Sequence, residues 1–159
     1  MASVSGGGKL GAYLRKLAGR IDKANTLEVG FFENAQYPNG TKVASVAAFN
    51  EYGVPSHNQP PRPYFRTMIA DNKANWGGQL ANLVRFHSGD SKAALNAMGE
   101  EVVGLLQDSI RDLDFPPLAP STIARKSRGG VGKLHGVLGP AKPLVDTGVM
   151  LQSVTKRVS

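Results

Sequence analysis

The sequence predicts an α+β fold, in which a small antiparallel sheet packs with several helices and a long, basic, glycine-rich loop is present. Several segments carry apolar residues at helical spacing, and two short segments, near Thr26 and Val154, have the character of strands. The length of 159 residues suggests a single domain. Because a two-stranded sheet alone is only marginally stable, either the sheet has further strands or another subunit completes it.

The N-terminal part contains one predicted helix and one predicted strand. Residues 1–8 are expected to be disordered, ahead of a single domain over residues 9–159. Residues 9–24 predict an amphipathic helix, because apolar side chains recur there with lysines and arginines mostly between them: Leu10, Tyr13, Leu14, Leu17 and Ile21. The stretch TLEVGFF, residues 26–32, alternates apolar side chains on one face and therefore predicts a strand.

A turn and a short helix are predicted next. In the turn YPNG, Pro38 presets its own φ and Gly40 can take a positive φ. Thr41 can cap a helix over residues 42–52. Gly53 then stands where a glycine commonly follows the end of a helix.

The next helix is expected to begin at Pro63, because the fixed φ of proline suits the first helical position and its missing N–H would be unpaired there anyway. Gly77 and Gly78 are expected to bend or interrupt this helix, and Gly89 to end it. The most regular helix of the chain follows, with Asp90 or Ser91 as its cap. Its apolar residues are Leu95, Met98, Val102, Leu105, Leu106, Ile110 and Leu113, and Pro116–Pro117 closes it.

The C-terminal region combines a short helical turn at PSTIARK, a loop, a last turn of helix and a strand. Residues 125–142 contain five basic side chains, five glycines and no acid. This composition, without an apolar stripe, predicts a flexible loop. Asp146 or Thr147 is expected to cap the last turn of helix, and VTKRVS to form the final strand.

The net charge of +7 favours polyanions or acidic protein surfaces as partners and carries no information on fold. Besides the loop, a second basic cluster lies near the N-terminus, with only Asp22 to offset it: Lys9, Arg15, Lys16, Arg20 and Lys23.

The sequence contains no pattern that indicates catalysis or metal binding. Cysteine is absent, which excludes thiol chemistry and suits a reducing cytoplasm. The three histidines are far apart, without neighbours at metal spacing. RGGVGKL has Ser127 and Leu134 where a phosphate loop requires Gly and Ser or Thr. With no apolar run of about 18 residues, no transmembrane helix is expected. We therefore expect no enzyme, no cofactor and no metal.

Residues 50–66, NEYGVPSHNQPPRPYFR, form a segment that we call the proline bracket. It holds four prolines within nine residues, followed by two aromatic residues and an arginine. The segment has the residue types of an SH3-type ligand, and it could also be a linker. A rigid arm that leads into a helix is favoured, because Tyr64, Phe65, Met68 and Ile69 follow at helical spacing and require burial. The bracket could also serve as an interface arm.

Four stretches occur in an order that resembles one family. They are YPNGTKVASVAAFNEYG, PPRPYFR, LAPSTIARK and PLVDTGVMLQSV. In this order they resemble the neck and tail-completion proteins of tailed bacteriophages, also called head–tail joining or virion morphogenesis proteins. The match extends in islands from Tyr37 to Val154. The first helix and the glycine-rich loop carry none of it.

The resemblance implies a structural virion protein, assembled in the host cytoplasm, that forms a ring of six or twelve copies at the head–tail junction around the DNA channel. Its implied partners are copies of itself, the adjacent connector, tail-terminator or tail-tube proteins, and genomic DNA; no membrane is implied. A closed ring needs a heterologous interface, to which the bracket could contribute, and the basic loop could face the channel. The candidates for the interface or the channel are Arg62, Tyr64, Phe65, Arg66, Arg125, Lys126, Arg128 and Lys133.

Simpler interpretations compete with these assignments. Arg62 and Arg66 are expected to be salt-bridged or on the surface rather than bound to DNA, and Asp146 to be a helix cap rather than a catalytic acid. The basic loop is most simply a solvated flexible segment. The alternative function is a monomeric basic nucleic-acid-binding protein, whose loop and N-terminal helix bind phosphate with a strong dependence on salt.

Overall fold

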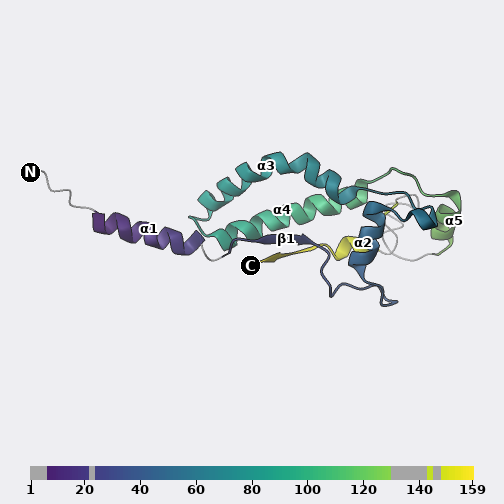
Figure 1. Ribbon diagram of the computed structural model, residues 1–159, viewed down its shortest axis with the longest axis horizontal. Coiled ribbons are helices and arrows are strands. Elements are labelled where there is room, and N and C mark those ends of the chain that lie inside the picture. The colour runs from purple at the N-terminus through teal and green to yellow at the C-terminus, as the bar shows by residue number, and fades with distance from the viewer. Residues whose placement is uncertain (1–6, 22–23, 130–142, 145–147) are drawn as a thin grey trace, which may run out of the picture. The chain divides into compact units, whose positions relative to one another are not determined.

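The computed structural model describes residues 7–21, 24–129, 143–144 and 148–159 (Figure 1). It shows the predicted α+β class: a two-stranded antiparallel sheet packs against several helices, and helix predominates. In chain order the elements are α1 Gly7–Ile21, β1 Leu27–Gly30, α2 Val43–Tyr52, the 3-10 helix η1 Pro55–His57, α3 Tyr64–Phe86, α4 Ser91–Asp112, α5 Pro120–Gly129, α7 Val149–Gln152 and β2 Thr155–Val158.

The chain divides into two compact units. Unit 1 takes its described residues from 1–28, 75–101 and 156–159, and unit 2 from 29–74 and 102–155. Helices α3 and α4 and both strands contribute residues to each unit. The expectation of a single domain over residues 9–159 stays a prediction.

In unit 1, α4 approaches the sheet closely at Gly99. A Cβ at this position would lie 2.5 Å from Lys156 Cδ and 2.9 Å from Leu27 Cδ1, so only glycine permits the approach without displacing both side chains. The ammonium of Lys156 donates to the main-chain and side-chain oxygens of Asn96 at 2.7 and 2.8 Å, and it pairs with Glu100 at 3.2 Å. These contacts fasten β2 to α4.

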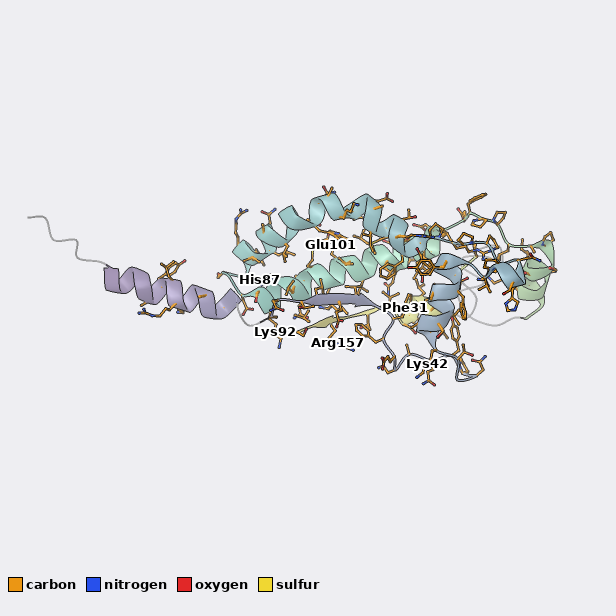
Figure 2. All side chains as sticks on the ribbon, in the orientation of Figure 1. Phe31, Lys42, His87, Lys92, Glu101 and Arg157 are labelled. Atoms are coloured by element: carbon orange, nitrogen blue, oxygen red, sulfur yellow. The ribbon has the colours of Figure 1, made fainter. Side chains whose placement is uncertain are left out.

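The two predicted strands are β1 and β2, and they pair with each other. Main-chain bonds extend the pairing past the strands: Ser159 N–H donates to Thr26 O at 3.1 Å, and Thr26 N–H to Ser159 O at 3.0 Å. Arg157, labelled in Figure 2, reaches Glu28 across the pair at 3.6 Å. In the part of the chain that the structure describes, the sheet has no third strand.

The start of α4 is tied to the end of α1 within unit 1. Asp90 is the cap of α4, because its Oδ1 accepts from Ala93 N–H at 3.0 Å. Ser91, the other predicted cap, instead joins the two helices. Its hydroxyl donates to Arg20 O at 3.1 Å and accepts from Ala24 N–H at 3.3 Å.

Unit 2 has its core between α2, the start of α3, the second half of α4 and α7. Its largest fully buried side chains are Tyr64, Leu106, Ile110 and Val43. Each contributes roughly 1.5–3 kcal/mol through burial. Polar side chains of α4 add two ties: Ser109 Oγ donates to Tyr64 O at 2.7 Å, and Gln107 Nε2 donates to Leu151 O at 3.3 Å.

Two helices differ from prediction in extent. Helix α1 begins at Gly7 rather than at residue 9, so Gly7 and Gly8 are helical instead of disordered. Residues 1–6 lie outside the described residues. Helix α3 continues through Gly77 and Gly78, so these glycines do not interrupt it. A glycine in a helix interior costs only about 1 kcal/mol, which a helix of 23 residues tolerates.

The predicted glycine positions are confirmed around α2, whereas the predicted cap is wrong. Gly40 has a φ of 82° and donates to Tyr37 O at 2.9 Å, and Gly53 has a φ of 75° just after α2. Thr41 does not cap α2, because the helix begins one residue later than expected. Lys42 takes the cap position, and its side chain makes no capping bond.

Pro63 immediately precedes α3 instead of beginning it, and its carbonyl accepts from Thr67 N–H at 3.2 Å. Helix α5 extends to Gly129 and so includes the first residues of the predicted loop. The basic, glycine-rich composition without an apolar stripe favoured a solvated loop there, but Lys126 is buried, so one side of α5 faces the interior. Residues 130–142 lie outside the described residues, as do the predicted caps Asp146 and Thr147.

Candidate functional site

The proline bracket is folded back on α2. Val54 N–H donates to Gln59 O at 2.9 Å, and Gln59 N–H donates to Val54 O at 3.1 Å. Arg62 N–H donates to Asn50 O at 2.7 Å, and the side-chain amide of Gln59 donates to Asn50 Oδ1 at 3.1 Å. These bonds close the bracket into a compact loop, as expected for an arm that packs.

Gly53 makes this fold possible. Besides its positive φ of 75°, a Cβ here would lie 2.7 Å from both Gln59 O and Pro61 N. Main-chain atoms at that distance leave no room for any side chain. The glycine after α2 is therefore required by the return of the bracket as well as by the end of the helix.

Tyr64 lies near the end of the bracket and is buried, which confirms the expectation that the aromatic residues after its prolines, Tyr64 and Phe65, include a buried one. Its hydroxyl donates to Ala47 O at 3.3 Å, and its ring meets that of Phe65 edge-on with centroids 6.3 Å apart. Burial raises the pKa of Tyr64, and the charge of Glu51 adds to the shift. The hydroxyl therefore remains a hydrogen-bond donor.

Glu51, which the sequence analysis did not identify as a candidate, binds the main chain at the start of α3. This buried carboxylate accepts from the main-chain N–H groups of Phe65 and Arg66 at 2.9 and 3.3 Å, and it pairs with Arg66 Nε at 3.0 Å. Arg66 also donates to Glu51 O at 3.1 Å and lies over the ring of Tyr52, 5.3 Å from its centroid. The available signal was an acid near the start of the bracket, Glu51, and a base at its end, Arg66. Negative charge at a helix N-terminus is stabilising.

The two arginines of the bracket have different surroundings. Arg66 is salt-bridged, as expected. Arg62 is neither on the surface nor in an ion pair with any described residue: it is 6% exposed, and its Nε has no hydrogen-bond partner among those residues. Burial lowers the pKa of Arg62. Its long aliphatic stem explains how so polar a residue packs here, which charge-based reasoning missed.

The basic candidates near the glycines are not one exposed set. Lys126 is buried, contrary to the expectation of a solvated position. Arg125 and Arg128 lie on α5, although the structure describes only their backbone. Lys133 lies outside the described residues. The side chain of Lys126, which the structure describes, lies in the pocket described next.

One pocket in unit 2, which we call the motif pocket, measures about 470 Å³ and draws residues from widely separated parts of the sequence. Three of the four sequence islands and the proline bracket line it. The lining residues are Tyr37, Asn39, Thr41, Val46 and Asn50, then Gln59, then Leu118, Thr122 and Lys126, and finally Pro143, Leu144 and Met150. The remaining island, PPRPYFR, is joined to α2 through Glu51.

A second hollow of unit 2, which we call the apolar groove, measures about 390 Å³ and gathers Tyr64, Phe65 and Arg66. Apolar side chains and the Glu51–Arg66 pair line it: Phe31, Ala44, Ala47, Ala48, Glu51, Tyr52, Tyr64, Phe65, Arg66 and Ile69. Phe31 is labelled in Figure 2. Tyr52 in this lining and Phe49 on the same helix are exposed large apolar residues.

Unit 1 contains a basic groove of about 640 Å³ between α1 and the end of α3. It is lined by Tyr13, Lys16, Arg20, Val84, Arg85, Ser88 and Gly89, so the described lining contains three cations and no acid. Arg20 Nη1 donates to Ser88 O at 2.8 Å. The sequence indicated the basic residues of α1, but not that Arg85 joins them.

Comparisons with protein-family models, with curated proteins and with solved structures found no match. Among the described residues, no group of three or more His, Cys, Asp or Glu side chains could hold a metal ion. None of the described helices is both long enough and apolar enough to cross a membrane.

Proposed function

We propose that this chain is a structural virion protein of a tailed phage, and that six or twelve copies form a ring at the neck. The ring would join the capsid connector to the tail around the DNA channel, without catalysis. The observation that carries the proposal is the order of the four islands together with their placement in unit 2. Three line the motif pocket and the fourth is tied to α2.

The apolar groove supports the proposal of a subunit interface. A ring of identical subunits needs two different surfaces that complement each other. Exposed apolar residues at a groove are typical of an interaction site. Tyr52 lines this groove and is exposed, and Phe49, on the same helix, is also exposed. A neighbouring copy of the chain is the occupant that we propose.

Removal of the gene from the phage that encodes the chain tests the proposal. We expect DNA-filled heads and separate tails, with joining restored when the protein is supplied. Imaging of the parent particle should show a ring of six or twelve copies at the neck. Infectious virions that lack the protein would overturn the proposal, as would a turnover activity that a single substitution abolishes.

The basic groove favours one alternative, a monomeric protein that binds nucleic acid through phosphate. On that hypothesis the logarithm of the binding constant falls linearly with the logarithm of salt concentration, with a slope of about −0.9 for each phosphate contact. Lys16→Gln and Arg85→Gln should each make the slope shallower by about one contact. Absence of binding to duplex DNA at low salt would remove this alternative.

A further inference from the structure

Helix α1 carries an apolar face that the subunit leaves open. Tyr13 is 63% exposed and Leu14 is 52% exposed. The hydrogen bonds that join α1 to the rest of unit 1 lie at its last turn, where Arg20 contacts Ser88 and Ser91. A helix of 15 residues is marginal in water without a packed apolar face. The exposed apolar residues of α1 are therefore expected to be buried against a partner.

The charge of α1 has one sign. The helix contains Lys9, Arg15, Lys16 and Arg20 and no acidic residue. A surface that covers α1 should therefore combine apolar area with negative charge.

The C-terminal end of α4 and the residues after it have this composition. Residues 108–115, DSIRDLDF, contain three acids and one base. Asp108 and Asp112 are four residues apart on α4 and so share one face; Asp108 pairs with Arg111, and Asp112 is exposed. Phe115, which follows them, is 78% exposed. This acidic, apolar segment is the acceptor patch.

We propose that α1 of one copy binds the acceptor patch, residues 108–115, of the next copy. This inference rests on the proposed ring and names one of its contacts. Tyr13 and Leu14 would cover Phe115, while Lys16, which lies one helical turn from Tyr13, would face the acids beside it. The two surfaces differ, so the contact is heterologous and repeats from copy to copy, as a ring requires. Complementary charge sets the pairing and its rate.

The apolar residues distinguish this occupant from DNA. Phosphates would neutralise Arg15 and Lys16, but a DNA backbone leaves Tyr13 and Leu14 uncovered. Only a partner with apolar surface next to negative charge satisfies both features of α1, and the acceptor patch has both.

Disulfide trapping between full-length chains tests the contact directly, because the chain has no cysteine of its own. One chain carries Leu14→Cys and the other Phe115→Cys, and the mixture is oxidised mildly. We expect a crosslinked pair to form much faster than in the matched mixture of Leu14→Cys with Lys73→Cys, in which the second position is exposed on α3. Equal rates in the two mixtures would overturn the inference.

Charge reversal identifies the partner surface. Arg15→Glu with Lys16→Glu in the Leu14→Cys chain should slow trapping roughly tenfold at low salt. Asp108→Lys with Asp112→Lys in the Phe115→Cys chain should restore it. Lys92→Glu, which changes an exposed residue of α4 (labelled in Figure 2), is the control reversal and should have little effect. Failure of the restoration would contradict the assignment of the acceptor patch.

Two further outcomes separate this inference from the function on which it rests. If imaging shows the ring at the neck but trapping fails, the proposed function stands and this contact is wrong. If trapping fails and the Arg15→Glu, Lys16→Glu chain instead loses binding to duplex DNA, α1 is a DNA-binding arm. If trapping succeeds but the protein is absent from the virion, the contact is supported and the proposed function at the neck is refuted.

Discussion

Glu51 lies in α2, yet it satisfies donors of another helix. Its carboxylate accepts from two N–H groups at the start of α3 and pairs with Arg66. Glu51→Ala should lower the free energy of unfolding by about 1–3 kcal/mol, because two part-buried N–H donors lose their acceptor and Arg66 loses its ion pair. Glu51→Gln should cost less, since one amide oxygen remains. Denaturant unfolding measures both, with the exposed Glu33→Ala as control. Equal stability of Glu51→Ala and the control would refute this role.

Gly53 and Gly77 provide a matched pair of glycines. Gly53 has a positive φ and main-chain atoms 2.7 Å from where a Cβ would be, whereas Gly77 lies in a helix with nothing within 4 Å. Gly53→Ala should destabilise the protein by about 1–3 kcal/mol. Gly77→Ala should stabilise it by up to about 1 kcal/mol. Thermal unfolding distinguishes the two, and a tolerated Gly53→Ala would mean that the bracket can leave α2.

The positions of some single residues could be predicted from the sequence, and those of others could not. The burial of Tyr64 and the turn at Gly53 could be predicted, because each follows from local pattern. The burial of Arg62 and Lys126 could not. Both are long charged residues whose aliphatic stems can be buried only where the tertiary structure provides apolar neighbours. Neither the spacing nor the composition of the sequence predicts those neighbours. The role of Glu51 likewise depends on the return of the bracket.

At the scale of elements, the approach of α4 to the sheet depends on Gly99. Gly99→Ala should destabilise the protein by about 1–3 kcal/mol, because the added methyl group overlaps Lys156 and Leu27. Gly104→Ala is the control, since Gly104 is in the same helix and has nothing within 4 Å. The difference in melting temperature between the two variants measures the effect. A melting temperature for Gly99→Ala at or above that of Gly104→Ala would contradict it.

Elements with a long apolar period were predicted best. Helices α3 and α4 were identified because their apolar residues recur over many turns, and the alternation in residues 26–32 located β1. The length of α5 was underestimated, because its polar sequence gave no sign that Lys126 is buried. The motif pocket itself is formed by residues that pack only after α2, α5 and α7 are folded, so no local pattern could place its lining together.

For the whole molecule, the burial of Lys126 removes this residue from the basic side chains that are expected to contact a partner. If the chain forms the proposed ring at the neck, Arg125→Gln, Arg128→Gln and Lys133→Gln together should weaken docking or DNA retention, and more so as salt rises, because salt screens the remaining ionic contacts within about 8–10 Å. The stability of the isolated chain should not change. Counting particles that retain DNA measures the effect, and parental counts at all salt concentrations would show that these charges are dispensable.

The sheet joins residues near the two ends of the described chain, β1 at Leu27–Gly30 and β2 at Thr155–Val158. During synthesis, β1 therefore emerges from the ribosome long before its partner exists. The bonds within the bracket join residues close in sequence, whereas the sheet cannot form until residues 155–158 have been made. Such distant pairings form late in folding. A nascent or truncated chain that stops before Thr155 would leave β1 as an unpaired edge, which is a template for aggregation.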